Sequence, residues 1–543
     1  MANDIGLSIE YTGEILVKLK AASSPRSSPA LLGDANRAAA GGGLGPARPV
    51  IDLGTVPVSP GNDLARWHRV SIAGGARMQL LSAVPPASEV WNSVHDLLRQ
   101  PEIDWAEPEV KAVQYLPPEF SQDRELQLAD DWHLGGPPGI RARDAWKLFD
   151  STGRKPGEGV IIGHLDTGYT DHPAVPRERF VDAGVDFWDP TRPDATDPLD
   201  SGIALMPGHG TGTICLLSAD APGYQGVAIG SRVLPVRISP SVIHIKTSSM
   251  ANGIVWAVHR GAEVITISMG GLPSQLWADA VNYAYENGVV ICAAAGNNFA
   301  LPLGIHTPSK VIFPARFNRV TAVAGITYKE MQYWTEKTFE MCGNYGPEVD
   351  VAAPTPDVLW AQPGGGYGPG AGTSSATPQT AGAAALWLSY HRERLAGMSP
   401  MEKVEACRGA LLRSASRVGP FPYQPAGRDG EYVHNDYFGD GRIDAAAALE
   451  IAPLAGLRAT PRDDVRDSLL NVVFKMLSGA DQGNTDALAD QIELLWTSHA
   501  VNLDAALHHA LALSASPALR DRMQGTAGPP ASVPFLGGAP KRS

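Results

Sequence analysis

Short apolar segments alternate with helix-length segments over residues 140–452, and this alternation is the strongest regularity in the chain. Four of the apolar segments are nearly continuous: 160–165, 233–238, 264–268 and 289–293. Strands that are apolar on both faces and separated by helices are typical of a parallel sheet covered by helices on both faces. We therefore expect an α/β fold here, with functional residues beyond the carboxyl ends of the strands.

The N-terminal 115 residues follow a different pattern, which predicts a small α+β unit. A helix is expected over 87–100, because Val90, Val94 and Leu97 recur at helical spacing on one face. The strands are expected in three segments of alternating or β-rich composition: 14–20, 67–72 and 103–110. Residues 1–115 are therefore expected to form a domain of their own.

Two segments of biased composition interrupt or separate these domains. Residues 21–65 are rich in Ala, Gly, Ser and Pro, a composition that buries too little apolar surface to offset the entropy of the chain. We predict a disordered insertion there. Residues 116–139 carry Pro and Glu near their start and are predicted to be a linker.

The end of the chain is predicted to be all-helical over 457–523 and disordered over 524–543. Apolar residues recur at helical spacing in the first of these segments, whereas the second is rich in Pro, Gly and Ala. A helical appendage packed on the preceding domain and a module that recruits a partner protein both fit this pattern. The sequence does not decide between them.

The overall charge narrows the range of partners. The formal net charge is −13, and nucleic acid and anionic membranes both attract basic surfaces, so neither is expected as a partner. The chain has no run of about 18 apolar residues, the length that spans a bilayer, and its first residues lack a basic cluster followed by an apolar run. We therefore expect a cytoplasmic protein.

Neither the cysteines nor the acidic residues show the spacing of a metal site. The cysteines are expected to be small buried residues: Cys215, Cys292, Cys342 and Cys407. Six aspartates form an acidic loop: Asp182, Asp186, Asp189, Asp194, Asp197 and Asp200. Calcium prefers such oxygen ligands, but the spacing matches no EF-hand, so a solvated loop is favoured over a structural calcium site. No cofactor or metal is expected to take part in the chemistry.

Three short motifs with reactive side chains lie where a strand ends or a helix begins. Asp166 follows an apolar strand in Leu-Asp-Thr-Gly, and His209 opens a helical stretch in Gly-His-Gly-Thr. Ser374 precedes a helix in Gly-Thr-Ser-Ser-Ala-Thr-Pro. Active sites of parallel α/β folds lie beyond the carboxyl ends of the strands, which is where these side chains are expected.

Together, these residue types can carry acyl transfer. A serine hydroxyl becomes nucleophilic when an imidazole within hydrogen-bond reach removes its proton, and a buried carboxylate fixes the tautomer of that imidazole. We assign Ser374 as nucleophile, His209 as general base and Asp166 as the residue that orients His209. Asn297, which ends the run Ala-Ala-Ala-Gly-Asn after a strand, is assigned as a donor to the oxyanion.

In the chain order Asp, His, Ser, these motifs resemble those of the subtilisin-like serine proteases, the subtilases of peptidase family S8. The most specific motif is Gly372-Thr373-Ser374-x-Ala376-x-Pro378, and the resemblance extends over about residues 140–450. It implies the same roles for the four residues named above. It also implies a subtilisin-like fold and a serine endopeptidase that acts on proteins or peptides.

The resemblance also implies the walls of the primary specificity pocket, which holds the residue before the scissile bond. The wall that pairs with the substrate backbone is formed by Ser268, Met269, Gly270 and Gly271. The opposite wall is formed by Ala295 and Gly296. Ile312 stands where the family often has a glycine at the floor of this pocket. A shallow, apolar pocket is therefore implied.

Residues 1–115 resemble the family's N-terminal propeptide, an inhibitor I9-like unit that helps the protease to fold, inhibits it and is usually cut off. Cleavage is expected within 115–130. In an alternative interpretation, the uncleaved unit keeps the chain silent and the protease fold serves as a regulatory or partner-binding module. The presence of all four catalytic residue types favours the peptidase.

Two histidines near Asp166 are given structural roles. His164 lies within the apolar strand that ends at Asp166, and His172 precedes Pro173. A histidine in such a position is more often a buried core residue than a catalytic one.

Overall fold

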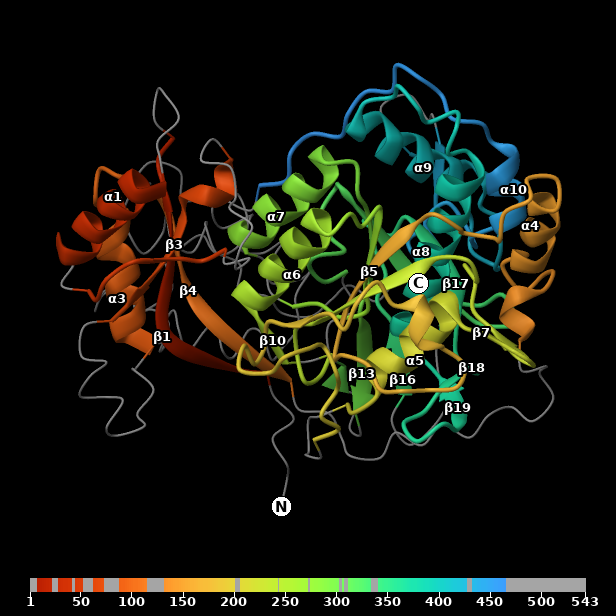
Figure 1. The fold of residues 1–543 in the computed structure, drawn as a ribbon, viewed down its shortest axis with the longest axis horizontal. Coiled ribbons are helices and arrows are strands. Elements are labelled where there is room, and N and C mark those ends of the chain that lie inside the picture. The colour runs from red at the N-terminus through yellow and green to blue at the C-terminus, as the bar shows by residue number, and fades with distance from the viewer. Residues whose placement is uncertain are drawn as a thin grey trace, which may run out of the picture.

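The computed structural model describes residues 7–21, 28–41, 44–51, 62–72, 87–114, 131–200, 206–242, 244–271, 274–301, 305–306, 311–333, 340–426 and 432–464. Two parts pack against each other in Figure 1. We call residues 7–114, red to orange, the N-terminal unit, and residues 131–464 the main domain.

The N-terminal unit is an antiparallel sheet with two helices on the face turned away from the main domain (Figure 1). Its elements are β1 (Leu7–Leu19), α1 (Ser28–Gly41), β2 (Arg48–Pro49), η1 (Asp63–Arg66), β3 (Trp67–Ser71), α3 (Ala87–Leu98) and β4 (Ile103–Gln114). The strand order is β10-β4-β1-β3-β2, so β10 (His244–Lys246) of the main domain extends this sheet. The three predicted strands and the predicted helix are therefore confirmed.

The prediction of a disordered insertion over 21–65 is wrong for α1, for β2 and for the start of η1, which all lie within it. Leu31, Ala35, Ala38 and Ala39 recur along α1 at helical spacing and are buried. Alanine buries little surface, so the composition of this segment predicted disorder. Alanine also has the highest helix propensity, and its small side chain allows close packing. The triple glycine at 41–43 begins at the last residue of this helix, where glycine commonly ends a helix.

The main domain contains the predicted parallel sheet. Its strands are β5 (Ile161–Asp166), β6 (Val185–Asp186), β9 (Arg232–Arg237), β11 (Val264–Ile267), β12 (Val290–Ala294), β15 (Val320–Ile326) and β17 (Val351–Pro354). They are all paired in parallel, in the order β17-β15-β12-β11-β5-β9-β6. The four apolar segments of the sequence form four adjacent strands of this order, which confirms the expected α/β fold.

Helices cover both faces of this sheet. They are α4 (Ala142–Phe149), α5 (His209–Ser218), α6 (Thr247–His259), α7 (Gln275–Glu286), α8 (Thr373–Tyr390), α9 (Pro400–Ser414) and α10 (Ala445–Glu450). Along β12, Val290 and Cys292 join the hydrophobic cluster that includes α8, whereas Ile291 and Ala293 join the cluster of α6 and α7. This alternation is the period of two of a β-strand. No helix of the described ranges is long and apolar enough to cross a membrane.

Short elements complete the main domain. They are η2 (Trp132–Leu134), η3 (Arg177–Arg179), β7 (Asp220–Ala221), β8 (Tyr224–Gln225), β13 (Asn297–Leu301), β14 (Ile305–His306), β16 (Glu340–Gly343), β18 (Val358–Ala361), β19 (Tyr367–Gly370), β20 (Gln424–Ala426) and β21 (Tyr432–His434). The element η2 falls within the predicted linker 116–139, yet His133 and Leu134 are fully buried. Residues 131–139 therefore fold with the main domain, because their apolar side chains are part of its core.

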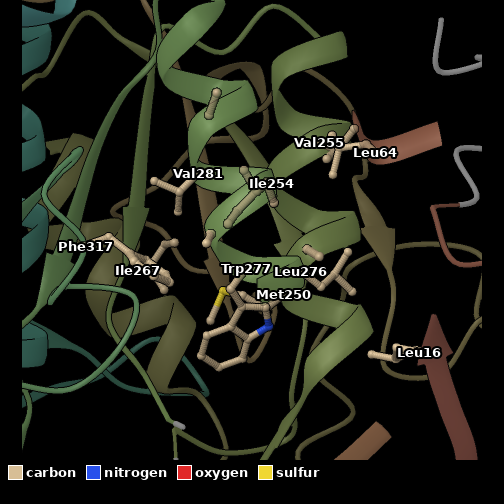
Figure 2. Close-up of a cluster of buried hydrophobic side chains, with 14 of the residues drawn as sticks. Leu16, Leu64, Met250, Ile254, Val255, Ile267, Leu276, Trp277, Val281 and Phe317 are labelled. Carbon is tan, nitrogen blue, oxygen red and sulfur yellow. The ribbon is translucent and has the colours of Figure 1, made fainter. Parts of the chain in front are cut away.

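The two parts share one hydrophobic cluster, which Figure 2 shows. Leu16 and Leu64 of the N-terminal unit belong to the same buried cluster as Ile254 of α6 and Trp277 of α7. Burying apolar surface releases roughly 25 cal/mol per Å². The N-terminal unit is thus held to the outer face of α6 and α7 by a continuous core.

An extended strap, residues 451–464, runs from α10 back to the N-terminal unit (blue in Figure 1). Asp463 accepts hydrogen bonds from the backbone N–H groups of Asn318 and Arg319 at 2.8 and 3.1 Å. The prediction of helix over 457–523 is wrong for 457–464, because Pro461 and these contacts hold the chain extended. Residues 465–543, which include the rest of the predicted helical region and the tail, lie outside the described residues.

Three of the four cysteines are buried, as predicted, and Cys342 is half-buried. Cys215, Cys292 and Cys407 are free thiols. Burial raises the pKa of Cys292 to about 12, so that this thiol stays protonated and unreactive at neutral pH.

The stability of the main domain is expected to fall in acid because of His133. Burial lowers the pKa of this imidazole from 6.5 to about 3. Between these values the unfolded chain binds the extra proton, so the free energy of unfolding should decrease as the pH falls, by up to about 1.4 kcal/mol per pH unit. Neither ring nitrogen has a hydrogen-bond partner within the described chain, so His133→Phe breaks no hydrogen bond. Urea unfolding of both proteins at a series of pH values should show a shallower slope for the variant; equal slopes would contradict this account.

Candidate active site

Asp166 and His209 are brought together by the end of a strand and the start of a helix. Asp166 is the last residue of β5, and His209 is the first residue of α5. His209 Nδ1 lies 2.7 Å from Asp166 Oδ1. An ionised carboxylate only accepts hydrogen bonds, so Nδ1 carries the proton and Nε2 is left as the acceptor. Asp166 is fully buried and His209 is 7% exposed, so water screens this pair very little.

The buried carboxylate of Asp166 is held ionised by its neighbours. The backbone N–H of Thr167 donates to Oδ1 at 2.7 Å, and the hydroxyl of Thr213 lies 3.2 Å from Oδ2. Burial by itself would raise the pKa of Asp166, but the neighbouring His209 and the hydrogen bonds from His209 and the Thr167 N–H outweigh it and lower the pKa below its usual value. Asp166 can therefore stabilise a proton on His209 while remaining charged itself.

Ser374 is the second residue of α8, where a proline changes the hydrogen bonding of the helix. The backbone N–H of residue 378 would normally donate to the carbonyl of Ser374, but Pro378 has none. The hydroxyl of Ser268, just beyond β11, donates to this carbonyl at 3.0 Å instead. In return, Ser374 Oγ donates to the carbonyl of Ser268 at 3.0 Å. Because the proline follows Ser374 by four residues, the carbonyl of Ser374 is free to accept from Ser268, and two hydrogen bonds hold the serine at the end of β11.

In this arrangement, no hydrogen bond within the described chain joins Ser374 to His209. Nucleophile–base hydrogen bonds are often long or misaligned without substrate. An indole connects the two motifs instead: the Trp360 ring packs edge-on against His209, with ring centroids 5.6 Å apart. A Cβ built on Gly370, four residues before Ser374, would lie 2.8 Å from the same indole. Trp360 therefore contacts both His209 and the approach to the serine.

Asn297 lies beside the loop that precedes Ser374. Its Oδ1 accepts the backbone N–H of Thr373 at 2.9 Å. This bond assigns the orientation of the amide and leaves Nδ2 as a donor. Gly372 has a φ of 78°, and a Cβ there would lie 3.0 Å from Asn297 Nδ2. Glycine thus keeps the space next to this donor open.

Ile312 lies between the two predicted pocket walls. A Cβ built on Gly270 would be 2.6 Å from Ile312 Cδ1, and one built on Gly296 would be 3.0 Å from it. The backbone N–H of Ile312 donates to the carbonyl of Ala295, and Gly271 forms a β-bridge with Phe313. The isoleucine side chain therefore fills the narrow space between two glycines. Met269 is buried in the core, so only its backbone is available to this wall.

Three contacts of the site escaped the sequence analysis: those of Trp360, Thr213 and His164. Trp360 gave no signal of its own, because its place depends on space left by two distant glycines, Gly212 and Gly370. Thr213 follows His209 by four residues on a helix, and His164 precedes Asp166 by two on a strand. Both spacings place side chains on the same face and could have suggested these contacts.

Five of the six carboxylates of the acidic loop are engaged with backbone N–H groups or with arginine. Asp194 accepts the N–H of Thr196, Asp197 accepts those of Leu199 and Gly208, and Asp186 pairs with Arg237 at 2.6 Å. Within the described ranges, no group of three or more potential ligands is placed to hold a metal ion. These residues therefore do not fit a preformed calcium site, and no step of the chemistry is assigned to a metal.

Comparison with known proteins agrees with this geometry. Residues 157–441 match the model of the subtilase family, Peptidase_S8. Thermitase of Thermoactinomyces vulgaris is 33% identical over 310 residues, which cover 56% of this chain and 95% of thermitase. Subtilisin E of Bacillus subtilis (strain 168) is 33% identical over 288 residues, covering 52% of this chain and 69% of subtilisin E. The thermophilic serine proteinase of Bacillus sp. (strain AK1) is 32% identical, over 52% of this chain and 65% of that protein.

A solved structure supports the fold. Fervidolysin of Fervidobacterium pennivorans, described as a keratinolytic enzyme related to subtilisin, is similar with a TM-score of 0.53 and 21% identity. The similarity covers 82% of this chain and 62% of fervidolysin. The family match over 157–441 and the identity to thermitase and subtilisin E show that the chain belongs to the subtilase family and is a serine-type endopeptidase of protein or peptide substrates.

Proposed function

We propose that the chain hydrolyses peptide bonds through an acyl-enzyme formed on Ser374. The observation that carries this proposal is the buried 2.7 Å contact between His209 and Asp166, next to a serine held at a helix start. His209 Nε2 takes the hydroxyl proton as Ser374 Oγ attacks the carbonyl carbon, and the same proton then passes to the leaving amine. Water repeats the sequence on the acyl-enzyme, which releases the acid and restores the serine.

The negative oxygen of the tetrahedral intermediate would be bound by two donors. One is Asn297 Nδ2, whose orientation follows from the bond between Oδ1 and Thr373. The other is the backbone N–H of Ser374, since the first four N–H groups of a helix have no partner within the helix. The positive end of the α8 dipole adds to this stabilisation.

Removal of the nucleophile should abolish turnover. Ser374→Ala is expected to lower the rate of degradation of a denatured protein by about 10⁴-fold or more, because the remaining oxyanion donors act without a nucleophile. Ser375→Ala, which removes the next hydroxyl on the same helix, serves as the matched control and should stay active. Equal degradation by wild type and Ser374→Ala would overturn the proposed activity.

We propose that the N-terminal unit is an inhibitory propeptide. Two carboxylates of β4 accept hydrogen bonds at the starts of helices of the main domain. Glu109 Oε1 accepts the N–H of Ser248 in α6. Glu107 Oε1 accepts the hydroxyl of Ser274, and its Oε2 accepts the N–H of Gln275 at the start of α7. Carboxylates are favoured at helix N-termini. Residues 111–113, near the end of β4, pair with β10, so this end of the N-terminal unit lies along a strand of the main domain. The proposed cleavage within 115–130 lies outside the described residues.

A buried ion pair should be necessary for this docking. Lys18 of the N-terminal unit lies 2.6 Å from Asp279 of α7, and both side chains are at most 3% exposed. Asp279→Asn leaves a buried lysine without its counter-charge, which typically costs about 3–5 kcal/mol. In the uncut Ser374→Ala chain, hydrogen exchange at β4 should therefore become roughly a hundredfold faster or more.

The matched control is Arg462→Gln, which removes an ion pair across the same interface between Arg462 and Asp63, 46% and 38% exposed, and keeps the carboxylate of Asp63 in place. Exposed pairs contribute little, so exchange at β4 should barely change. If Asp279→Asn also leaves exchange at β4 unchanged, the N-terminal unit is not held by this pair.

We propose that the primary specificity pocket accepts small apolar side chains. Ile312 Cδ1 occupies the space between Gly270 and Gly296, which would otherwise admit a large side chain. The described groups next to these two glycines are Ile312, the carbonyl of Phe313 and the amide of Asn344, none of which is charged. A basic residue before the scissile bond would therefore meet no counter-charge from them. The substrates are thus expected to be cut after residues such as alanine.

Removal of the isoleucine side chain should open this pocket. Ile312→Gly is expected to raise the preference for phenylalanine over alanine before the scissile bond by about 10-fold to 200-fold, with Ile312→Ala between it and the wild type. A peptide library with that position varied measures the change. A wild-type profile dominated by Lys or Arg, or a variant profile equal to it, would contradict this assignment.

A further inference from the structure

A second histidine and a threonine lie behind the catalytic carboxylate. His164 precedes Asp166 by two residues on β5, so both side chains point to the α5 side of the sheet. Thr213 follows His209 by four residues on α5, so both point toward β5. His164 Nε2 lies 2.8 Å from Thr213 Oγ1, and Thr213 Oγ1 lies 3.2 Å from Asp166 Oδ2. His164 and Thr213 are at most 1% exposed.

The number of protons in this group fixes the direction of its hydrogen bonds. Asp166 is ionised and can only accept, so the single hydroxyl proton of Thr213 is the one available to Oδ2. The carbonyls of His209 and Gly210 also lie 3.3 and 3.1 Å from this hydroxyl. These carbonyls already face helix N–H groups, and a bond to a charged acceptor is about twice as strong, so donation to Asp166 prevails.

His164 must then donate to the threonine. With the hydroxyl proton directed at Asp166, Thr213 Oγ1 can only accept from the ring, so Nε2 carries the proton. Burial lowers the pKa of His164 to about 4, so the ring is neutral near pH 7 and its Nδ1 bears no proton. That nitrogen is buried and has no hydrogen-bond partner within the described chain. The ring is therefore held by polar contacts only through Nε2, on the side of the active site.

We propose that His164 and Thr213 are positioning residues of the catalytic carboxylate. His164 orients the hydroxyl of Thr213, and Thr213 holds Asp166 Oδ2 so that Oδ1 faces His209 Nδ1. A neutral imidazole performs this task without placing a second cation 3.8 Å from Asp166, where it would oppose protonation of His209. This inference rests on the proposed function, because it assigns the two residues to the orientation of the general base.

Four single variants test the two bonds. Thr213→Val and His164→Leu remove a donor with little change of volume, whereas Thr213→Ser and His164→Gln keep a hydroxyl and a donor near the position of Nε2. After each chain has released its own N-terminal unit, Thr213→Val and His164→Leu should lower kcat about tenfold with KM unchanged, and the two conservative variants should stay within about threefold of wild type. The double variant should be no slower than the slower single variant, since both changes break one chain of bonds.

The concentration of active enzyme is measured by titration with a fluorophosphonate, so that kcat refers to folded, reactive molecules. His391→Leu is the matched control: His391 is another buried histidine, and its Nε2 bonds to the carbonyl of Leu449 at 3.0 Å just after the far end of α8. Its kcat should be unchanged. If Thr213→Val and His164→Leu keep the wild-type kcat, or if the effects of the two changes add, the inference is wrong while the proposed peptidase stands. An inactive wild type would overturn both.

Discussion

The buried carboxylate of Asp166 sets the main constraint on this molecule. A charge removed from water must be compensated by hydrogen bonds and an opposite charge. In this chain the compensation comes from the N–H of Thr167, the hydroxyl of Thr213 and the imidazole of His209, on a strand, its following loop and a helix. The parallel sheet fixes the strand, and the start of α5 fixes the histidine. The fold and the proposed chemistry thus depend on the same few contacts.

The same principle of compensation explains the serine and the N-terminal unit. Because Pro378 has no N–H to donate to the carbonyl of Ser374, the hydroxyl of Ser268 donates to this carbonyl instead. At the interface, Glu107 and Glu109 accept hydrogen bonds from backbone N–H groups at the starts of two helices. Asp279 pairs with Lys18 and neutralises its charge. A unit bound through buried charges is released only when several bonds break together. Such an interface suits the proposed role of an inhibitor that remains bound until it is cut.

The sequence predicted the parallel sheet, the contact between Asp166 and His209 and the strands of the N-terminal unit, because all of these follow from local periodicity or short motifs. It failed at α1, since a helix rich in alanine has the composition of a disordered segment. It also failed at 457–464, where contacts with distant residues such as Asn318 hold the chain extended. Trp360 could not be found either, because its position against His209 depends on glycines far apart in the chain.

The most direct measurement of the central claim is the site at which a fluorophosphonate reacts. Such a reagent bonds to a serine oxygen that a neighbouring base has activated, so the adduct identifies the nucleophile. Mass spectrometry of the labelled chain is predicted to find one adduct, on Ser374, and no adduct when the folded chain carries His209→Ala. An adduct on Ser268 or Ser375, or equal labelling of Ser374 without His209, would contradict the account.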